Sequence, residues 1–173
     1  MVHALRYTLV CTARITVPQA LPALVRRAVR TALHAHKVRR AVLSIVFIDD
    51  REMARLHRHF LGKRSATDVL TFDLSETSAK RGPGTVEGEI IISLSTARRE
   101  ASRRRQTVAA EAALYAVHGT LHLLGYDDAT AADALHMHSV EDEILRAVGL
   151  VDVFGRRATR AARVTGAVRA KSA

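Results

Sequence analysis

Two histidines and an aspartate lie close together in the stretch Val117–Asp128, VHGTLHLLGYDD, and could bind a metal ion. His118 and His122 are four residues apart, so on a helix their imidazoles project from the same face, one turn apart. Gly125 is a natural helix terminator, and Asp128 follows far enough behind for a loop to return it to the same point. Two histidines and one carboxylate are a ligand set of catalytic zinc that leaves a fourth position for water. The spacing therefore predicts one divalent ion on His118, His122 and Asp128, which would make its bound water more acidic.

Several neighbouring side chains are alternatives for roles in this site. Asp127 is the main rival of Asp128 as a ligand, and one of the two can cap the following helix while the other binds the ion. His136 and His138 are two residues apart on a predicted helix, so they face different directions, and we expect them in solvent or in the core. The residue after the first histidine is Gly119. It is not the glutamate that serves as general base in His-Glu-x-x-His peptidases, which disfavours a standard zinc-peptidase mechanism.

The rest of the pattern predicts the elements that must position these residues. Alternating β-branched residues or compact apolar runs indicate strands, and apolar residues spaced three and four apart indicate helices. The expected strands are Tyr7–Val17, Ala41–Ile48, Thr67–Asp73 and Glu89–Leu94. The first expected helix begins at Pro18 or Pro22 and ends near His36, and the second, Arg51–His59, can be capped by Asp49 and Asp50. The other expected helices are Thr96–Arg105, Thr107–Leu124 and Thr130–Val148. This order predicts a single-domain α+β fold. We expect a mixed sheet of about four strands that packs with about five helices, and we expect the metal site in the C-terminal half of one helix.

Charge divides the chain into two parts. The length of 173 residues suits one domain, which we place at residues 1–153. Residues 154–173 hold six basic residues and no acidic one, so of the net charge of +10 only +4 belongs to residues 1–153. A basic protein favours polyanions such as RNA, but a like-charge run at a chain end is commonly a disordered tail, and we expect that for 154–173. Aromatic residues are only 4%, so no elaborate base-stacking platform is expected.

The remaining composition bears on the compartment. Cys11 is the only cysteine, so no internal disulfide can form, which fits a reducing compartment. No apolar run approaches the about 18 residues of a membrane span, and the first residues lack the apolar core and cleavage site of a secretory signal. We expect a cytoplasmic protein with no membrane partner.

The stretch His118–Asp127, HGTLHLLGYD, closely resembles the signature of the YbeY family of metallo-endoribonucleases, the bacterial ribosomal RNA maturation factors. Two upstream blocks resemble the same family in the right order: Leu56, Phe60, Gly62-Lys63 and Thr67–Phe72 in one, and Gly88–Ser93 in the other. The resemblance implies one zinc ion per chain and cleavage of single-stranded RNA, with no DNA specificity. It further implies action in small-subunit ribosomal RNA maturation and ribosome quality control, with the ribosomal small subunit as a partner.

Asp128 departs from the family pattern, which has histidine at the third ligand position. A carboxylate oxygen can bind zinc, but an anionic ligand reduces the net positive charge at the metal. We therefore expect the bound water to be less acidic than with three histidines, and the metal preference to relax toward harder ions such as manganese. In pH–rate profiles, the activity optimum of Asp128→His is expected at lower pH than that of the wild type. An optimum that stays in place or moves to higher pH would contradict this expectation.

Leu61 is the second departure, because the family has an arginine just before Gly-Lys that is associated with the substrate phosphate and catalysis. Leucine cannot bind an anion, so Arg58, Lys63 and Arg64 are the candidates for substrate binding. A guanidinium binds phosphate bidentately, whereas a lysine offers a point charge. The basic helix before the histidine helix is a further candidate for RNA contacts. Glu89 could line the cleft on its strand, but we expect it to be an exposed residue at a sheet edge.

Two other classes of function stay open. One is a different metallohydrolase, such as a peptidase or amidase, built on the same helix. The other is a ribosome-associated zinc-binding protein with lost or weak catalysis, an interpretation that Leu61 favours. The leading hypothesis is a zinc-dependent endoribonuclease in which His118, His122 and Asp128 act catalytically through the water on the ion.

Overall fold

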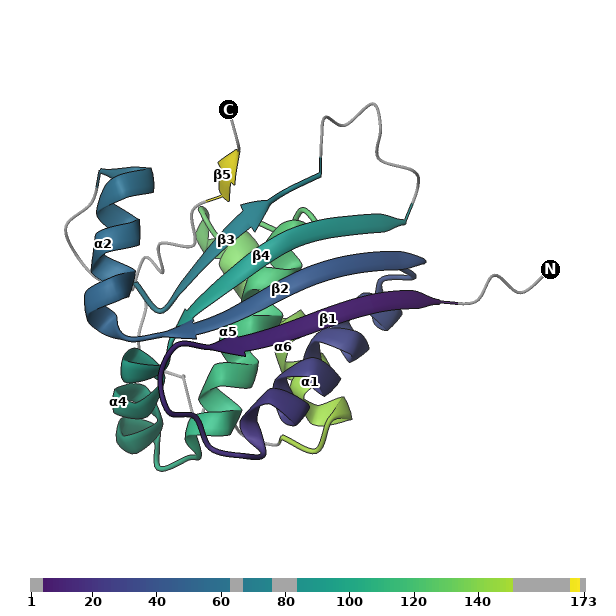
Figure 1. The fold of residues 1–173 in the computed structure, drawn as a ribbon. Coiled ribbons are helices and arrows are strands. Elements are labelled where there is room, and N and C mark those ends of the chain that lie inside the picture. The colour runs from purple at the N-terminus through teal and green to yellow at the C-terminus, as the bar shows by residue number, and fades with distance from the viewer. Residues whose placement is uncertain (1–4, 63–66, 76–83, 151–168, 172–173) are drawn as a thin grey trace.

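The computed structural model describes residues 5–62, 67–75, 84–150 and 169–171 (Figure 1). Its sheet has the order β1-β2-β4-β3-β5 and consists of β1 (Arg6–Ala13), β2 (Arg40–Ile48), β3 (Val69–Asp73), β4 (Thr85–Ser93) and β5 (Arg169–Lys171). The pairs β1–β2, β2–β4 and β3–β5 are parallel, and β3–β4 is antiparallel. The helices are α1 (Leu21–Ala35), α2 (Asp50–Leu61), α4 (Leu94–Arg104), α5 (Val108–Leu123) and α6 (Ala131–Ala147). The predicted α+β fold is confirmed, and the short β5 joins the four predicted strands.

The main core lies between the sheet and the helices α1, α5 and α6, which Figure 1 shows behind the strands. Side chains alternate between the two faces of a strand, and Ile45, Phe47, Ile90 and Ile92 all point to this side and are completely buried. The sheet, α1, α4 and α6 surround α5. Because it is enclosed in this way, α5 is buried along nearly its whole length and is apolar on almost every side.

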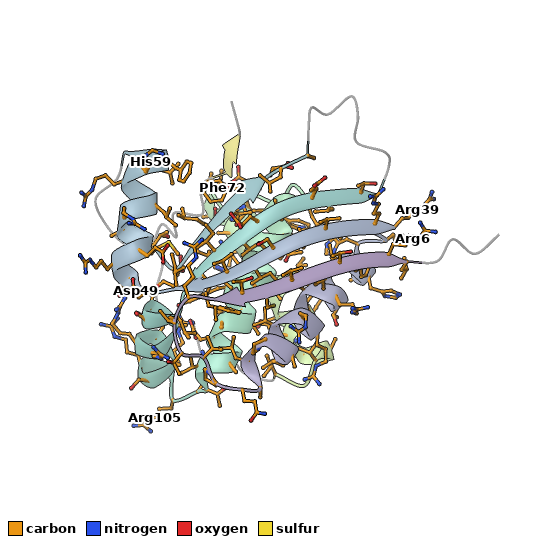
Figure 2. All side chains as sticks on the ribbon, viewed as in Figure 1. Arg6, Arg39, Asp49, His59, Phe72 and Arg105 are labelled. Atoms are coloured by element: carbon orange, nitrogen blue, oxygen red, sulfur yellow. The ribbon has the colours of Figure 1, made fainter. Side chains whose placement is uncertain are left out.

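Helix α2 packs on the opposite face of the sheet. Met53 is buried there against Leu70 and Ile91, which alternate with the strand residues that face α5. The predicted cap is confirmed, because Asp49, labelled at the start of α2 in Figure 2, accepts a 2.8 Å hydrogen bond from the Glu52 N–H. The sheet therefore separates α2 from the helix that carries the two histidines.

The strand boundaries differ most from the prediction in two places. β1 ends at Ala13 and not at Val17, because its pairing with β2 stops there. β4 begins at Thr85 and not at Glu89, because backbone pairing extends beyond the apolar run that marks the strand in the sequence. Glu89 lies on an internal strand, is half-buried, and accepts a 3.1 Å hydrogen bond from the Ser44 hydroxyl. The expectation that it is an exposed edge residue was therefore wrong.

Most of the basic tail lies outside the described residues. So does the predicted domain boundary between 153 and 154, and the division of the chain there stays a prediction. Within the tail, Arg169–Lys171 pair with the last three residues of β3. Among the described residues, no helix combines the length and the apolar character that crossing a membrane requires.

Candidate metal centre

The beginning and the end of α5 fix the position of the two histidines. Thr107 caps the N-terminus by accepting a backbone N–H at 3.1 Å. At the C-terminus, Gly125 adopts φ +98° and donates to the His122 carbonyl, while the Tyr126 N–H donates to the Leu121 carbonyl, both at 3.0 Å. This pattern ends a helix with a left-handed residue, a conformation that glycine adopts without strain. The chain therefore turns directly after α5 and brings the two aspartates back to its end.

His118, His122 and Asp128 converge at this helix end, as the spacing predicts. The Nε2 atoms of the two histidines are 3.1 Å apart, and each lies 3.9 Å from one carboxylate oxygen of Asp128. Both rings are buried, and the Asp128 side chain is 13% exposed. The three ligand atoms lie within 4.8 Å of one another, so the three residues can hold one metal ion.

Hydrogen bonds on the far side of each ring decide which nitrogen faces the centre. Nδ1 of His122 lies 3.1 Å from the Tyr126 carbonyl oxygen, which can only accept, so Nδ1 carries the proton. Nδ1 of His118 lies 2.6 Å from a carboxylate oxygen of Glu141 on α6, which also only accepts when it is ionised. When the rings are neutral, both Nε2 atoms are therefore lone pairs directed at the centre.

The surroundings of the two rings separate their pKa values. Burial is the largest influence on His118 and disfavours its charged form, but the hydrogen bond and the charge of Glu141, with help from nearby aspartates, raise the pKa of His118. Burial lowers the pKa of His122, the charge of His118 lowers it further, and Asp128 acts in the opposite direction. A proton that binds to this pair of rings therefore favours His118 over His122, and a cation at the centre would have to displace it.

The donor set fits a zinc ion. Two Nε2 lone pairs 3.1 Å apart repel each other unless a proton or a cation lies between them. Tetrahedral zinc with bonds of about 2.0–2.1 Å holds its ligand atoms roughly 3.3 Å apart, near the nitrogen–nitrogen distance and within a small side-chain rotation for the carboxylate. The C-terminal end of a helix also carries partial negative charge, which favours a cation.

The neighbouring residues that were alternative candidates for the metal site lie in other surroundings. Oδ1 of Asp127 accepts the backbone N–H groups of the next two residues at 2.8 and 3.2 Å, and so closes the turn. The N-cap of α6 is Thr130, so neither aspartate caps that helix. His136 is exposed, and its ring stacks on Tyr126 with a centroid distance of 5.6 Å. His138 is half-buried on the same helix.

The predicted substrate-binding residues are not part of the described metal centre. Arg58 is exposed on α2, on the face of the sheet opposite α5. Lys63 and Arg64 lie outside the described residues. Leu61 is half-buried and packs on the small apolar cluster beneath α2. The role of these three basic residues in RNA binding stays a prediction.

The arginine side chains of the basic helix α4 make hydrogen bonds and ion pairs within the protein. Four of its arginines have partners: Arg98 donates to the Thr16 carbonyl (2.7 Å), Arg99 pairs with Asp50 (2.9 Å), Arg103 with Glu100 (3.0 Å) and Arg104 with the buried Glu111 (2.7 Å). Three of these partners lie on other parts of the chain, so the arginines attach α4 to its neighbours. A structural role therefore explains much of this basic run, and we do not assign α4 to RNA binding.

Gly119, next to His118, marks a close approach of α5 to the sheet. A Cβ atom at this position would lie 2.9 Å from Ile90 Cγ2 and 2.9 Å from Thr71 Oγ1. Both neighbours are β-branched side chains with little rotamer freedom. Overpacking costs roughly 1–3 kcal/mol, against about 1 kcal/mol that alanine gains over glycine in a helix. Gly119→Ala is therefore expected to lower the free energy of unfolding by up to about 2 kcal/mol and to weaken zinc binding by displacing His118.

Denaturant unfolding of Gly119→Ala measures this effect. In the double variant, Thr71→Ala removes one of the two contacts and is expected to recover part of the lost stability. A Gly119→Ala protein more stable than the wild type would contradict the packing described here, because alanine would then show its helix preference without any cost from a close contact.

Glu141 is not among the predicted site residues, although its position in the sequence carries a signal. It lies 23 residues after His118 in a helix with other acidic residues, so nothing local connects it to the metal centre. Its position, however, matches the apolar stripe of α6, which includes Met137, Ile144 and Leu145. A carboxylate on the buried face of an amphipathic helix is uncommon unless it is paired, and this pattern could have singled it out.

Tyr126 is the second residue whose role only the structure reveals. Its carbonyl binds His122, and its hydroxyl lies 2.8 Å from Nε2 of His36, the residue that ends α1. Nδ1 of His36 lies 2.8 Å from the Ala32 carbonyl, which can only accept, so Nδ1 carries a proton and the Tyr126 hydroxyl can donate to Nε2 of the ring when Nε2 carries none. Helix α1 thus supports the turn that orients His122.

Fold and site together define an α+β protein with a candidate centre of two histidines and one aspartate at the end of a buried helix. A family model described as Endoribonuclease YbeY matches residues 11–149. A relative of that name from Pelotomaculum thermopropionicum is 36% identical over 140 residues, which are 79% of this chain and 92% of the relative. The chain belongs to the YbeY family, as the resemblance of its motifs indicated.

Other relatives are more similar over shorter stretches. The protein named Endoribonuclease YbeY from Anaeromyxobacter sp. (strain Fw109-5) is 48% identical over 111 residues, 64% of this chain and 56% of the relative. Its counterpart in Anaeromyxobacter dehalogenans is 45% identical over 124 residues, 70% of this chain and 63% of the relative. The chain therefore matches less than two thirds of the length of these two relatives.

A solved structure shares the fold. The solution structure of a Thermotoga maritima protein aligns with a TM-score of 0.56 at 19% sequence identity, covering 88% of this chain and 100% of that one. This likeness independently supports the arrangement of sheet and helices that positions the candidate centre.

Proposed function

We propose that this protein is a zinc-dependent endoribonuclease that cleaves single-stranded RNA. The observation that carries the proposal is the convergence of His118, His122 and Asp128 at the end of α5 in a member of the YbeY family. The name of its relatives supports RNA as the substrate, and so does the net charge of +10. The proposed substrate is small-subunit ribosomal RNA during maturation and quality control in the cytoplasm. The proposed partner is the ribosomal small subunit, and the proposed cofactor is one zinc ion per chain.

The proposed chemistry is hydrolysis of a phosphodiester bond. Zinc on His118, His122 and Asp128 would supply a Lewis acid and lower the pKa of a water in the fourth position. The protein's own contribution is preorganisation: the Tyr126 carbonyl and Glu141 bind the Nδ1 atoms, so both Nε2 atoms face the same point. The carboxylate of Asp128 completes the donor set from the turn that follows Gly125.

RNA binding requires positive charge on the protein surface. Arg58, Lys63 and Arg64 remain the proposed contacts to the RNA backbone. Neutralising backbone phosphates gives affinity with little base preference and a strong dependence on salt. Affinity for single-stranded RNA is therefore expected to fall steeply with ionic strength and to change little with base sequence.

A substrate panel tests the proposed function. Zinc-loaded protein is incubated with a labelled single-stranded RNA, the same RNA in a duplex, DNA of the same sequence, and a peptide mixture. The expected result is cleavage of the single-stranded RNA alone, which a chelator abolishes and added zinc restores. RNA cleavage that persists after complete metal removal would refute zinc dependence, and cleavage of peptide instead of RNA would refute the nuclease.

One observation favours a second candidate, a ribosome-associated zinc-binding protein without catalysis. Leu61, at the position where the family arginine is expected, packs on the apolar cluster beneath α2 and offers no charge to a phosphate. Binding of zinc and RNA without cleavage would support this candidate. A peptidase is disfavoured further by Gly119, because a side chain at that position would collide with Ile90 and Thr71 and could not serve as a general base.

A further inference from the structure

Glu141 is a buried carboxylate in direct contact with a candidate metal ligand. We propose that Glu141 is a positioning residue of the centre: it holds the His118 ring by Nδ1, directs Nε2 at the ion, and thereby raises zinc affinity. The inference rests on the part of the proposed function that assigns a metal ion to His118, His122 and Asp128.

The burial of Glu141 requires an explanation. The residue is 1% exposed, and its neighbours along the same face of α6, Met137, Ile144 and Leu145, are buried apolar residues. A carboxylate in such surroundings is costly unless it is paired and hydrogen-bonded. Its oxygen lies 2.6 Å from His118 Nδ1, slightly shorter than the about 2.7–2.9 Å typical of a hydrogen bond from nitrogen to an ionised carboxylate. The contact with His118 therefore accounts for an acid at a position that packing alone would give to an apolar residue.

The same contact determines what His118 offers to the centre. An ionised carboxylate accepts the Nδ1 proton, so Nε2 of the neutral ring is the lone pair, 3.1 Å from Nε2 of His122. Without this partner the ring could rotate or adopt the other tautomer, and part of the population could not bind metal. The negative charge also makes the imidazole a stronger donor. Glu141 thus contributes both orientation and basicity.

The two histidines are oriented by different means. The backbone carbonyl of Tyr126, four residues after His122, holds the His122 ring. A side-chain substitution at Tyr126 does not remove this carbonyl. His118 depends on a side chain from α6, which packs against α5. Zinc affinity is therefore sensitive to the docking of α6, and Glu141 is the residue through which a substitution can test this.

The test compares Glu141→Gln and Glu141→Ala with wild type and with Glu143→Gln, the same chemical change at an exposed position of α6. Zinc affinity is measured by competition with a chromophoric chelator. It is expected to fall about 10–100-fold in the Glu141 variants and to stay unchanged in Glu143→Gln. Glutamine can accept the Nδ1 proton but carries no charge, so Glu141→Gln is expected between wild type and Glu141→Ala.

Nitrogen-15 NMR of the His118 ring in the metal-free protein gives a second readout, which a purely structural role would not move. At a pH where the ring is neutral, wild type and Glu143→Gln are expected to show Nδ1 protonated, and Glu141→Ala a mixture of tautomers. Unchanged zinc affinity in both Glu141 variants, or an unchanged tautomer in Glu141→Ala, would overturn the proposal. If Glu141→Ala does not fold, the affinity of Glu141→Gln decides. A wild-type protein that binds no zinc refutes the proposed function, while the ring signal still decides whether Glu141 orients His118.

Discussion

His122→Ala is expected to abolish tight zinc binding and, with it, cleavage of RNA. The substitution leaves His118 and Asp128 as protein ligands, one fewer than a catalytic zinc site uses. The loss of affinity should exceed the roughly 10–100-fold that follows removal of an outer hydrogen-bond partner. Metal analysis after dialysis measures the retained zinc. Because a ligand that binds the native state raises its stability, added zinc should also raise the Tm of the wild type but not that of the variant.

His34→Ala is the matched control for this experiment. His34 is exposed on the last turn of α1, so the same change of residue there removes no ligand. The control should retain zinc, the zinc-dependent rise in Tm, and activity. Zinc retained by His122→Ala in the same amount as by the wild type would show that the histidines of α5 do not bind the ion.

Phe47→Ala is expected to have the largest effect on stability. The Phe47 side chain is completely buried on β2, an internal strand, and belongs to the core between the sheet and the helices. Removing a buried phenylalanine side chain typically costs about 3–5 kcal/mol, because apolar contacts are lost and a cavity remains. Native proteins have roughly 5–15 kcal/mol of stability, so the variant should be marginally folded. Urea or thermal unfolding of the metal-free protein measures the difference.

Phe60→Ala makes the same substitution at an exposed site. Phe60 is 50% exposed near the end of α2, and its ring meets Phe72 edge-on at a centroid distance of 5.0 Å. Figure 2 labels Phe72 on β3 close to this end of α2. The ring also meets His59 at a centroid distance of 4.8 Å, and the loss of each aromatic pair should cost about 0.5–1.5 kcal/mol, less in total than removal of the buried Phe47. If both substitutions destabilise the protein equally, the position of the core described here is incorrect.

Much of the candidate centre could be predicted from the sequence because its determinants are local. The spacing of His118 and His122 fixes their common face once a helix forms, since the helical repeat is independent of the rest of the fold. The end of that helix at Gly125 is also determined locally, because glycine adopts the left-handed backbone conformation of a helix end without strain. The return of Asp128 to the helix end follows from the short chain between them, although the sequence did not exclude Asp127.

The sequence alone thus determined the helices, the four principal strands, and the two histidines with an aspartate from the pair Asp127 and Asp128, all through patterns within about 20 residues. The tertiary structure decided the strand order that places β4 between β2 and β3, the position of α2 on the far side of the sheet, and the contact of Glu141 with His118. These features depend on how whole elements pack. Residues that are distant in the chain meet only when separate apolar faces are buried together, and no periodicity along one segment records which faces those will be.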